Sequence, residues 1–223
     1  MSFFHNLFAR KQGAEKAPEC TLPEATFLVL ADFHTWMVTE SDWASLEELF
    51  EADPPDAVLL LGDILPEDAA RIARMANGTP CLYVLGNHDL WHQYDGIEGL
   101  QDLDGAVTEI RGIRLAGISG APRYRDDPER VMRTQEEART VAASLPAAEI
   151  LISHESPYRM LNHDQAHEGF MGITQYIRKH NPALHLFGHH HIRHQEIVNG
   201  TLEVCVFHAA LVRTENMDVQ ELF

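Results

Sequence analysis

The sequence has few cysteines and lacks any long hydrophobic run. Its three cysteines, Cys20, Cys81 and Cys205, form no CxxC pair, and such an odd, scattered set fits reduced thiols in a reducing compartment. No apolar run approaches the roughly 18 residues that span a bilayer, and the N-terminus shows no hydrophobic signal segment followed by a small-residue cleavage site. We therefore expect a cytoplasmic protein without a transmembrane segment.

Basic residues are also scarce. The chain has 17 Lys+Arg against 34 Asp+Glu, which gives a formal net charge of -17. This balance argues against a broad basic surface, so a nucleic-acid partner is not expected. It does not exclude a small anionic substrate, because bound cations would invert the local charge.

The length and the hydrophobic content favour one globular domain behind an N-terminal arm. The chain has 223 residues, of which 45% are hydrophobic, enough for a substantial core. We place the domain at residues 26–223 and the arm at 1–25. Phe3, Phe4, Leu7 and Phe8 follow a helical spacing, which indicates a short amphipathic helix on a linker. Packing on its own domain, membrane contact and self-association remain alternatives for this arm, and the oligomeric state stays open.

Buried strands alternate with helices over much of the chain. Continuous apolar runs predict strands, and a β-α-β-α-β order at the start predicts parallel strands with right-handed crossovers. The predicted strands are 26–31, 57–61, 81–85, 149–152 and 184–187, with a hairpin at 107–110 and 113–118 and closing strands at 194–198, 201–207 and 217–222. The predicted helices are 43–52, with Ser41 or Asp42 as N-cap, 66–75, 129–145 and 169–180, and residues 90–105 are expected to form loop and short helix.

Polar side chains follow the buried strands at the points where these end. They are Asp32 and His34, Asp63, Asn87 and His88, His154, and His189 and His191. Any one of them fits an ordinary strand-ending turn, but the repetition over several strands makes chance a poor explanation. The crevice beyond the carboxyl ends of parallel strands is a usual ligand site. Carboxylate, carboxamide and imidazole donors suit Mn, Fe, Zn, Co or Ni, and two ions would use seven of these side chains.

The motif set D-x-H, G-D, G-N-H-D, a strand-ending H and G-H-x-H, in this order, resembles the calcineurin-like metallophosphoesterase family. The resemblance covers residues 26 to about 210 and implies an α/β fold, a four-layer αββα sandwich of two mixed β-sheets flanked by helices. It also implies a dinuclear centre of divalent or trivalent transition-metal ions, with Mn or Fe favoured. The activity implied is hydrolysis of a phosphodiester or phosphomonoester by attack of a metal-bound hydroxide.

The resemblance also assigns roles to individual residues. Asp32, His34 and His191 would hold one metal, whereas Asn87, His154 and His189 would hold the other. Asp63 would bridge the two ions. His88 would contact the scissile phosphate and protonate or stabilise the leaving oxygen, which contributes on the order of 10² to 10⁴ in rate. Asp89 would orient His88.

Substrate-side residues are less defined. Arg123, in a polar loop at 119–128, and His163 and His167, in the loop at 155–168, are candidates, with solvated or structural roles as the alternatives. The loop at 155–168 is expected to be too polar for a core and to border the cleft.

Three functions remain open at this stage. The residues after Asp63 read Ile64-Leu65-Pro66-Glu67 and lack the Asp-Arg-Gly that follows this motif in protein Ser/Thr phosphatases, so that substrate class loses support. We expect a hydrolase of a small phosphoester, with phosphodiesters slightly favoured by analogy. A metal-binding scaffold that has lost catalysis and a nuclease are the alternatives. The complete ligand set counts against the scaffold, and the acidic composition counts against the nuclease.

Overall fold

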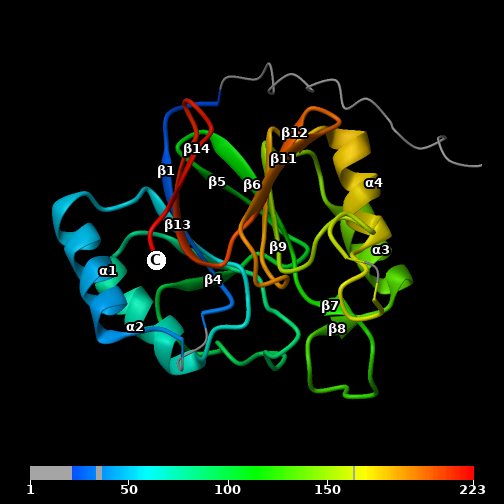
Figure 1. The fold of residues 1–223 in the computed structure, drawn as a ribbon, viewed down its shortest axis with the longest axis horizontal. Helices are drawn as coiled ribbons and strands as arrows, with labels where there is room; N and C mark the ends of the chain where they lie inside the picture. Colours follow the sequence, from blue (N-terminus) through cyan, green and yellow to red (C-terminus); the bar gives the residue numbers. More distant parts are fainter. Residues whose placement is uncertain (1–21, 34–36, 163) are drawn as a thin grey trace, which may run out of the picture.

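The fold consists of two β-sheets packed face to face between two layers of helices. The structure is a computed structural model, and it describes residues 22–33, 37–162 and 164–223. Helices α1 (Glu40–Ala52) and α2 (Pro66–Ala76) cover the outer face of one six-stranded sheet, and α3 (Gln135–Ser144) and α4 (Met171–His180) cover the other (Figure 1). This arrangement confirms the predicted αββα sandwich. The N-terminal arm lies largely outside the described residues.

The first sheet has the strand order β14-β13-β1-β2-β3-β4. Strands β1 to β4 run parallel to one another, while β13 pairs antiparallel with both β1 and β14. The parallel order of β1, β2 and β3 is as predicted. The bounds are β1 (Thr26–Ala31), β2 (Ala57–Leu60), β3 (Cys81–Tyr83), β4 (Leu100–Asp102), β13 (His208–Arg213) and β14 (Asp218–Glu221).

The second sheet has the strand order β11-β12-β10-β9-β6-β5. Its centre is parallel, and an antiparallel hairpin lies at each edge. The bounds are β5 (Val107–Ile110), β6 (Ile113–Ile118), β9 (Ile150–Ser153), β10 (Leu184–Phe187), β11 (His194–Val198) and β12 (Thr201–Cys205). The short strands β7 (Ala121–Pro122) and β8 (Met132–Arg133) pair with each other separately.

The core is layered because both faces of each central strand are covered. In β1, Phe27 and Val29 face the second sheet, whereas Leu28 and Leu30 pack against the helices. Both sets are fully buried, which explains why this strand reads as a continuous apolar run rather than an alternating one. A third cluster joins the second sheet to α3 and α4. The sheets are therefore rigid supports for whatever their strand ends carry.

Two helix starts differ from the sequence prediction. Helix α1 begins after Thr39, whose hydroxyl and backbone form a capping box with Asp42, so neither Ser41 nor Asp42 is the N-cap. Helix α3 begins only after Thr134, which forms the same motif with Glu137. The predicted helix over 129–145 is therefore wrong in its first turn: Val131 donates its backbone N–H to Asp89 O at 3.3 Å, and strand pairing replaces helix there.

Other predicted elements agree more closely with the structure. The hairpins turn at Arg111-Gly112 and Asn199-Gly200, with positive φ at all four residues, as two-residue hairpin loops require. Residues 90–105 contain turns and β4 but no helix, so the short helix predicted there is wrong. Strand β13 was not predicted.

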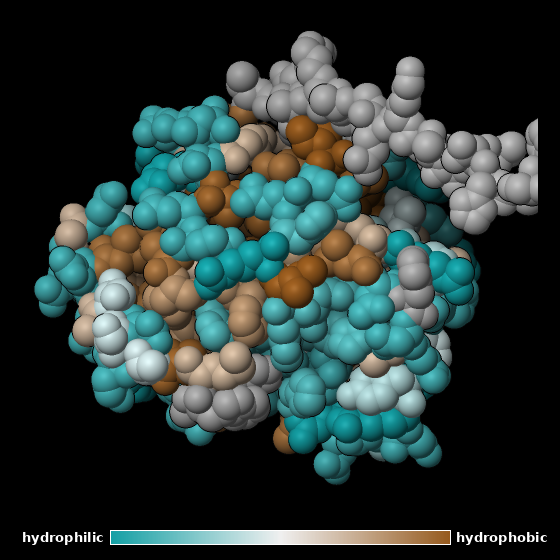
Figure 2. Space-filling model, viewed as in Figure 1, coloured by the Kyte–Doolittle hydropathy of each residue, from teal (hydrophilic) through white to brown (hydrophobic). Residues whose placement is uncertain are grey.

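The surface of the described residues is mostly polar. Figure 2 shows hydrophilic residues over most of this face, with hydrophobic residues gathered at its left and centre. Within the described ranges, no helix is long and apolar enough to cross a membrane.

Candidate metal centre

The carboxyl ends of strands from both sheets meet at one place. His154, which follows β9, places Nδ1 2.8 Å from the backbone oxygen of Leu61, which follows β2. The backbone N–H of His189, after β10, donates to Asp32 Oδ2 at 2.8 Å across the sheet interface. Backbone and side-chain hydrogen bonds therefore join the two sheets where the polar residues predicted for the site lie.

Two glycines allow this close approach. A Cβ atom on Gly86 would lie 2.2 Å from Asp63 Oδ1, and one on Gly62 would lie 2.4 Å from the backbone nitrogen of Gly86. Gly62 also has a φ of +94°, a conformation that residues with a side chain rarely adopt. The turns after β2 and β3 are in contact because neither carries a side chain at these positions.

Several buried atoms at the site direct lone pairs toward one another, with no hydrogen-bonding proton between them. The Leu61 carbonyl can only accept, so His154 Nδ1 carries the ring proton and Nε2 presents a lone pair. Nε2 lies 3.0 Å from Asn87 Oδ1 and 3.6 Å from Asp63 Oδ2. Asp63 Oδ2 is buried and has no hydrogen-bond partner among the described residues. Converging lone pairs of this kind fit a bound cation.

Asp32, Asp63 and His154 form a group that could hold a metal ion. Their donor atoms all lie within 4.8 Å of one another, and all three residues are buried. Asp32 Oδ2 accepts from the backbone, whereas the described residues place only His191 Nε2, at 3.4 Å, near its Oδ1. Buried carboxylate oxygens without donors are costly unless a cation compensates them. The residues present therefore fit a metal centre.

The pKa directions agree with this geometry. Burial lowers the pKa of His154 to about 3, so its imidazole is neutral near pH 7 and able to act as a ligand. Burial, together with the negative charges of Asp89 and Asp32, raises the pKa of Asp63 well above its ordinary value. The charges of Asp89 and Asp32 thus disfavour a charged Asp63 in the absence of a positive ion.

The backbone at the strand ends is held in a conformation that is uncommon outside glycine. Positive φ angles occur at Asp32 (51°), Asp63 (56°), His189 (69°) and His191 (51°). All four are residues predicted as metal ligands. Such strain persists only where the surroundings enforce it, and it is concentrated at functional sites.

The imidazole of His189 is oriented by the loop that follows β9. Its Nε2 donates to Ala166 O at 2.9 Å and lies 3.5 Å from Glu155 Oε2. His167 stacks on this ring, with 4.6 Å between ring centroids and 28° between planes. The loop therefore brings His167, predicted as a substrate-side residue, onto a predicted ligand. His163 lies outside the described residues.

His191 lies at the exposed edge of the site. Its Nε2 is 3.4 Å from Asp32 Oδ1, and 47% of its side chain is exposed. Its ring also stacks on Phe207, with 5.3 Å between centroids. The structure brings His191 and Asp32 together, as the assignment to one shared ion requires. His34, the third predicted ligand of that ion, lies outside the described residues.

The turn that contains His88 and Asp89 is fixed by its own carboxylate. Asp89 Oδ2 accepts from the backbone N–H groups of Gly86 at 2.7 Å and Asp63 at 2.8 Å. The His88 N–H donates to Asp63 Oδ1 at 2.8 Å, and the residue itself is exposed. Asp89 therefore braces two turns, and its predicted role of orienting the His88 side chain remains a prediction.

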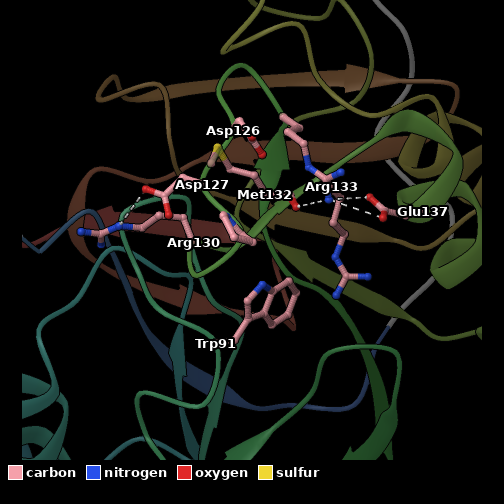
Figure 3. A pocket seen from close by; sticks show the side chains of 9 residues that line it. Trp91, Asp126, Asp127, Arg130, Met132, Arg133 and Glu137 are labelled. Atoms are coloured by element: carbon pink, nitrogen blue, oxygen red, sulfur yellow. Dashed lines mark hydrogen bonds and ion pairs between the residues drawn. The ribbon is translucent and has the colours of Figure 1, made fainter.

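Arg123 lies in a cavity next to this turn. The cavity has a volume of about 390 Å³, and Figure 3 shows Arg130 beside Asp127 on one side, Glu137 on the opposite side and Trp91 below. Arg123 pairs with Glu137 at 3.0 Å. Arg130, which lines the cavity, donates a hydrogen bond to the backbone oxygen of His88. The cavity is therefore connected to the turn that carries the predicted acid residue.

Sequence reasoning missed several residues of this region. Glu155 is fully buried and binds His190 Nε2 at 3.0 Å, so the prediction that its loop is too polar for a core is wrong at this residue. In the sequence, the one indication that Glu155 belongs to the site was its position directly after His154. Tyr124, whose hydroxyl lies 3.4 Å from Asn87 Nδ2, and Arg130 gave no distinctive pattern.

A second polar network lies behind the site in the second sheet. Ser153 Oγ is 2.7 Å from His185 Nε2, and His185 Nδ1 is 2.6 Å from Glu203 Oε2. All three residues are buried. Because Ser153 immediately precedes His154, this network supports the end of β9 from within the core.

Comparisons with known proteins agree with the fold and the motifs. The chain matches the family described as Calcineurin-like phosphoesterase superfamily domain over residues 26–211. The structure is similar to that of the protein TT1561 of Thermus thermophilus, with 20% identity, a TM-score of 0.67, and coverage of 88% of this chain and 97% of that one.

Two further solved structures share the fold. The phosphopantetheinyl hydrolase PptH of Mycobacterium tuberculosis is 16% identical, with a TM-score of 0.56 and coverage of 83% of this chain and 90% of that one. A novel archaeal phosphodiesterase is 14% identical, with a TM-score of 0.52 and coverage of 88% of this chain and 98% of that one. A search of curated protein sequences finds no match.

Proposed function

The chain belongs to the calcineurin-like phosphoesterase superfamily, and from this premise we propose that it hydrolyses a small phosphoester with the help of two transition-metal ions. A phosphodiester is favoured over a phosphomonoester. The observation that carries the proposal is the convergence of His154 Nε2, Asn87 Oδ1 and Asp63 Oδ2 without a proton donor between them. A dinuclear site would use this set, with Mn or Fe favoured.

The proposed ligand set follows the two sides of the site. Asp32, His34 and His191 would hold one ion, and Asn87, His154 and His189 would hold the other, with Asp63 between them. The ions, when bound, would neutralise negative charge on the phosphoryl oxygens and lower the pKa of coordinated water. Supporting this assignment, His189 uses Nε2 to donate to Ala166 O, which leaves Nδ1 as the unprotonated nitrogen of a neutral ring.

His88 is the proposed proton donor to the leaving oxygen. It is exposed, and its backbone is held against Asp63 by the N–H hydrogen bond to Oδ1. An imidazole titrates near neutral pH and can therefore donate a proton to a leaving alkoxide. Asp89 would act on this step by fixing the turn through Gly86 and Asp63.

A panel of metals and substrates tests the proposal. The purified chain, stripped of metal, is reconstituted with Mn, Fe, Zn, Co or Ni and assayed with bis(4-nitrophenyl) phosphate and 4-nitrophenyl phosphate. We expect metal-dependent turnover, faster with the diester, and a metal content near two ions per chain. Metal binding without turnover of either ester would instead support a non-catalytic scaffold, and a content of one ion or none would overturn the dinuclear site.

A further inference from the structure

The cavity beside the Gly86–Asp89 turn is built from two segments that pair with each other. Trp91 donates its backbone N–H to Glu129 O at 3.1 Å, and Val131 donates to Asp89 O at 3.3 Å. An isolated bridge joins Leu90 to Arg130. The cavity wall and the turn that carries His88 are therefore one hydrogen-bonded unit.

Three arginines line this cavity, and each is held by the protein. Arg123 Nη2 donates to Met132 O at 3.4 Å and to Glu137 at 3.0 Å. Arg130 donates to His88 O, and its Nε lies 4.0 Å from Asp127 Oδ2. Guanidinium groups fixed in this way lose little conformational entropy when they bind an anion, and their planar donors match phosphate.

Arg133 adds a donor that the protein itself does not use. The residue is 9% exposed, and its Nε is buried without a hydrogen-bond partner among the described residues. Its Nη2 is paired with Asp104, and the guanidinium lies 5.1 Å from the ring centre of Trp91 (Figure 3). A buried donor without an acceptor is costly, and Arg133 is also one of the residues that line the cavity.

The cavity is not simply basic. Asp126, Asp127 and Glu137 line it together with the arginines, so the lining offers acceptors as well as donors. A lone inorganic anion would meet both attraction and repulsion there. A ligand that carries hydroxyl groups next to a phosphate would meet both kinds of partner. The lining therefore favours a phosphorylated sugar over a simple anion or an apolar group.

We propose that this cavity binds the part of the substrate beyond the scissile phosphate, and that this part is a sugar carrying a second phosphate. The second phosphate contacts Arg123 and Arg133, while sugar hydroxyls face the acidic residues. This inference rests on the function proposed above, and it narrows the substrate to phosphoesters that contain two separate phosphates, as in a nucleotide with a second phosphate on its ribose.

Equilibrium binding tests the inference without requiring turnover. The Mn-reconstituted full chain is titrated in a calorimeter with adenosine 3′,5′-bisphosphate and with adenosine 5′-monophosphate at constant ionic strength. We expect the bisphosphate to bind about tenfold more tightly, because hydrogen bonds between charged groups contribute at least that factor. Arg123→Gln should remove most of this preference, because it removes a charged donor to the second phosphate. The side chain is half-exposed, so the change should not disturb the core.

Two controls locate the binding. Arg139→Gln removes an exposed arginine of α3 that pairs with Glu136 and should keep the preference. Ligand entry should quench the fluorescence of Trp91, and Trp91→Phe should lose that quench. Equal affinities for the two nucleotides, or an undiminished preference in Arg123→Gln, would overturn the inference.

The two proposals fail in different ways. Preferential binding of the bisphosphate by a protein that hydrolyses no phosphoester would overturn the proposed function and leave the binding site standing. Hydrolysis of phosphoesters by a protein that binds both nucleotides equally would overturn the proposed binding site and leave the proposed function standing.

Discussion

The two sheets contribute different chemistry to the candidate metal centre. The strand ends of the first sheet supply the carboxylates of Asp32 and Asp63 and the amide of Asn87, whereas those of the second sheet supply the imidazoles of His154 and His189. Asp32 and Asp63 each accept a backbone N–H on one oxygen, while His189 is oriented by a loop. The two carboxylates are thus held by backbone N–H groups from other strand ends, and the His189 imidazole by a backbone carbonyl.

On the proposed ligand assignment, we expect the first sheet to determine whether ions are held at all and the second sheet to determine how tightly they are held. Anionic donors provide most of the attraction for a cation, and both carboxylates lie at strand ends of the first sheet. The four variants below test this division, from the largest expected effect to the smallest.

Replacing the central carboxylate should have the largest effect. In Asp63→Ala we expect turnover to fall on the order of 10⁴-fold and the metal content to drop below two ions, because charge neutralisation by the ions supplies several kcal/mol. Metal analysis and steady-state kinetics measure both. The metal-free variant should unfold at no lower temperature, since a buried, repelled carboxyl group has been removed. Asp95→Ala, at an exposed carboxylate, is the control; a variant with full metal content and activity would refute the role of Asp63.

Removing the proposed proton donor should affect turnover but not metal binding. For His88→Ala we expect a loss on the order of 10³-fold in kcat with two ions still bound, because general-acid catalysis contributes in this range. His92→Ala changes an exposed histidine in the neighbouring turn and should leave kcat intact. Unchanged turnover in His88→Ala would contradict the assignment.

A substitution at Glu155 tests the contribution of the second sheet to metal binding. Its Oε2 lies 3.5 Å from His189 Nε2, and its Oε1 contacts His190. In Glu155→Gln we expect the metal affinity to fall about 10- to 100-fold, as is typical when the partner of a ligating histidine is changed. Titration with Mn measures this, and Glu98→Gln at an exposed site is the control. A loss of kcat with unaltered metal affinity would argue against a positioning role.

The network behind β9 should matter for stability rather than for chemistry. His185→Leu leaves Ser153 and Glu203 without their shared partner, so we expect the free energy of unfolding to fall by about 1–3 kcal/mol, with metal affinity changed much less than in Glu155→Gln. Urea denaturation measures the loss. The double variant His185→Leu/Glu203→Leu should recover part of it; no recovery would show that the pair is not the cause.

The sequence predicts the centre of the fold better than its edges. Strand β1 appears with the predicted bounds because its continuous apolar run has only one stable environment, a strand covered on both faces. The polar residues at strand ends are equally readable, since parallel strands place their carboxyl ends at one edge. The positions of Asp32, Asp63 and His154 followed from that rule.

Features that depend on distant partners could not be read in this way. Residues 129–134 have local helical character, yet Val131 pairs with the turn at Asp89, and strand pairing prevails there. Glu155 looks like a loop acid, and only the fold shows that His189 and His190 surround it. Strand β13 escaped prediction because its position beside β1 is a property of the topology.

The topology also affects how the protein folds while it is being synthesised on the ribosome. β1 begins the domain, but it pairs with β13, and Asp32 accepts from the backbone of His189. A nascent chain therefore cannot complete the proposed metal site until almost all of the domain has been translated, because His189 and His191 lie late in the sequence. The site should remain unable to capture metal during synthesis, so loading would be a post-translational event that depends on the metals then available in the cell.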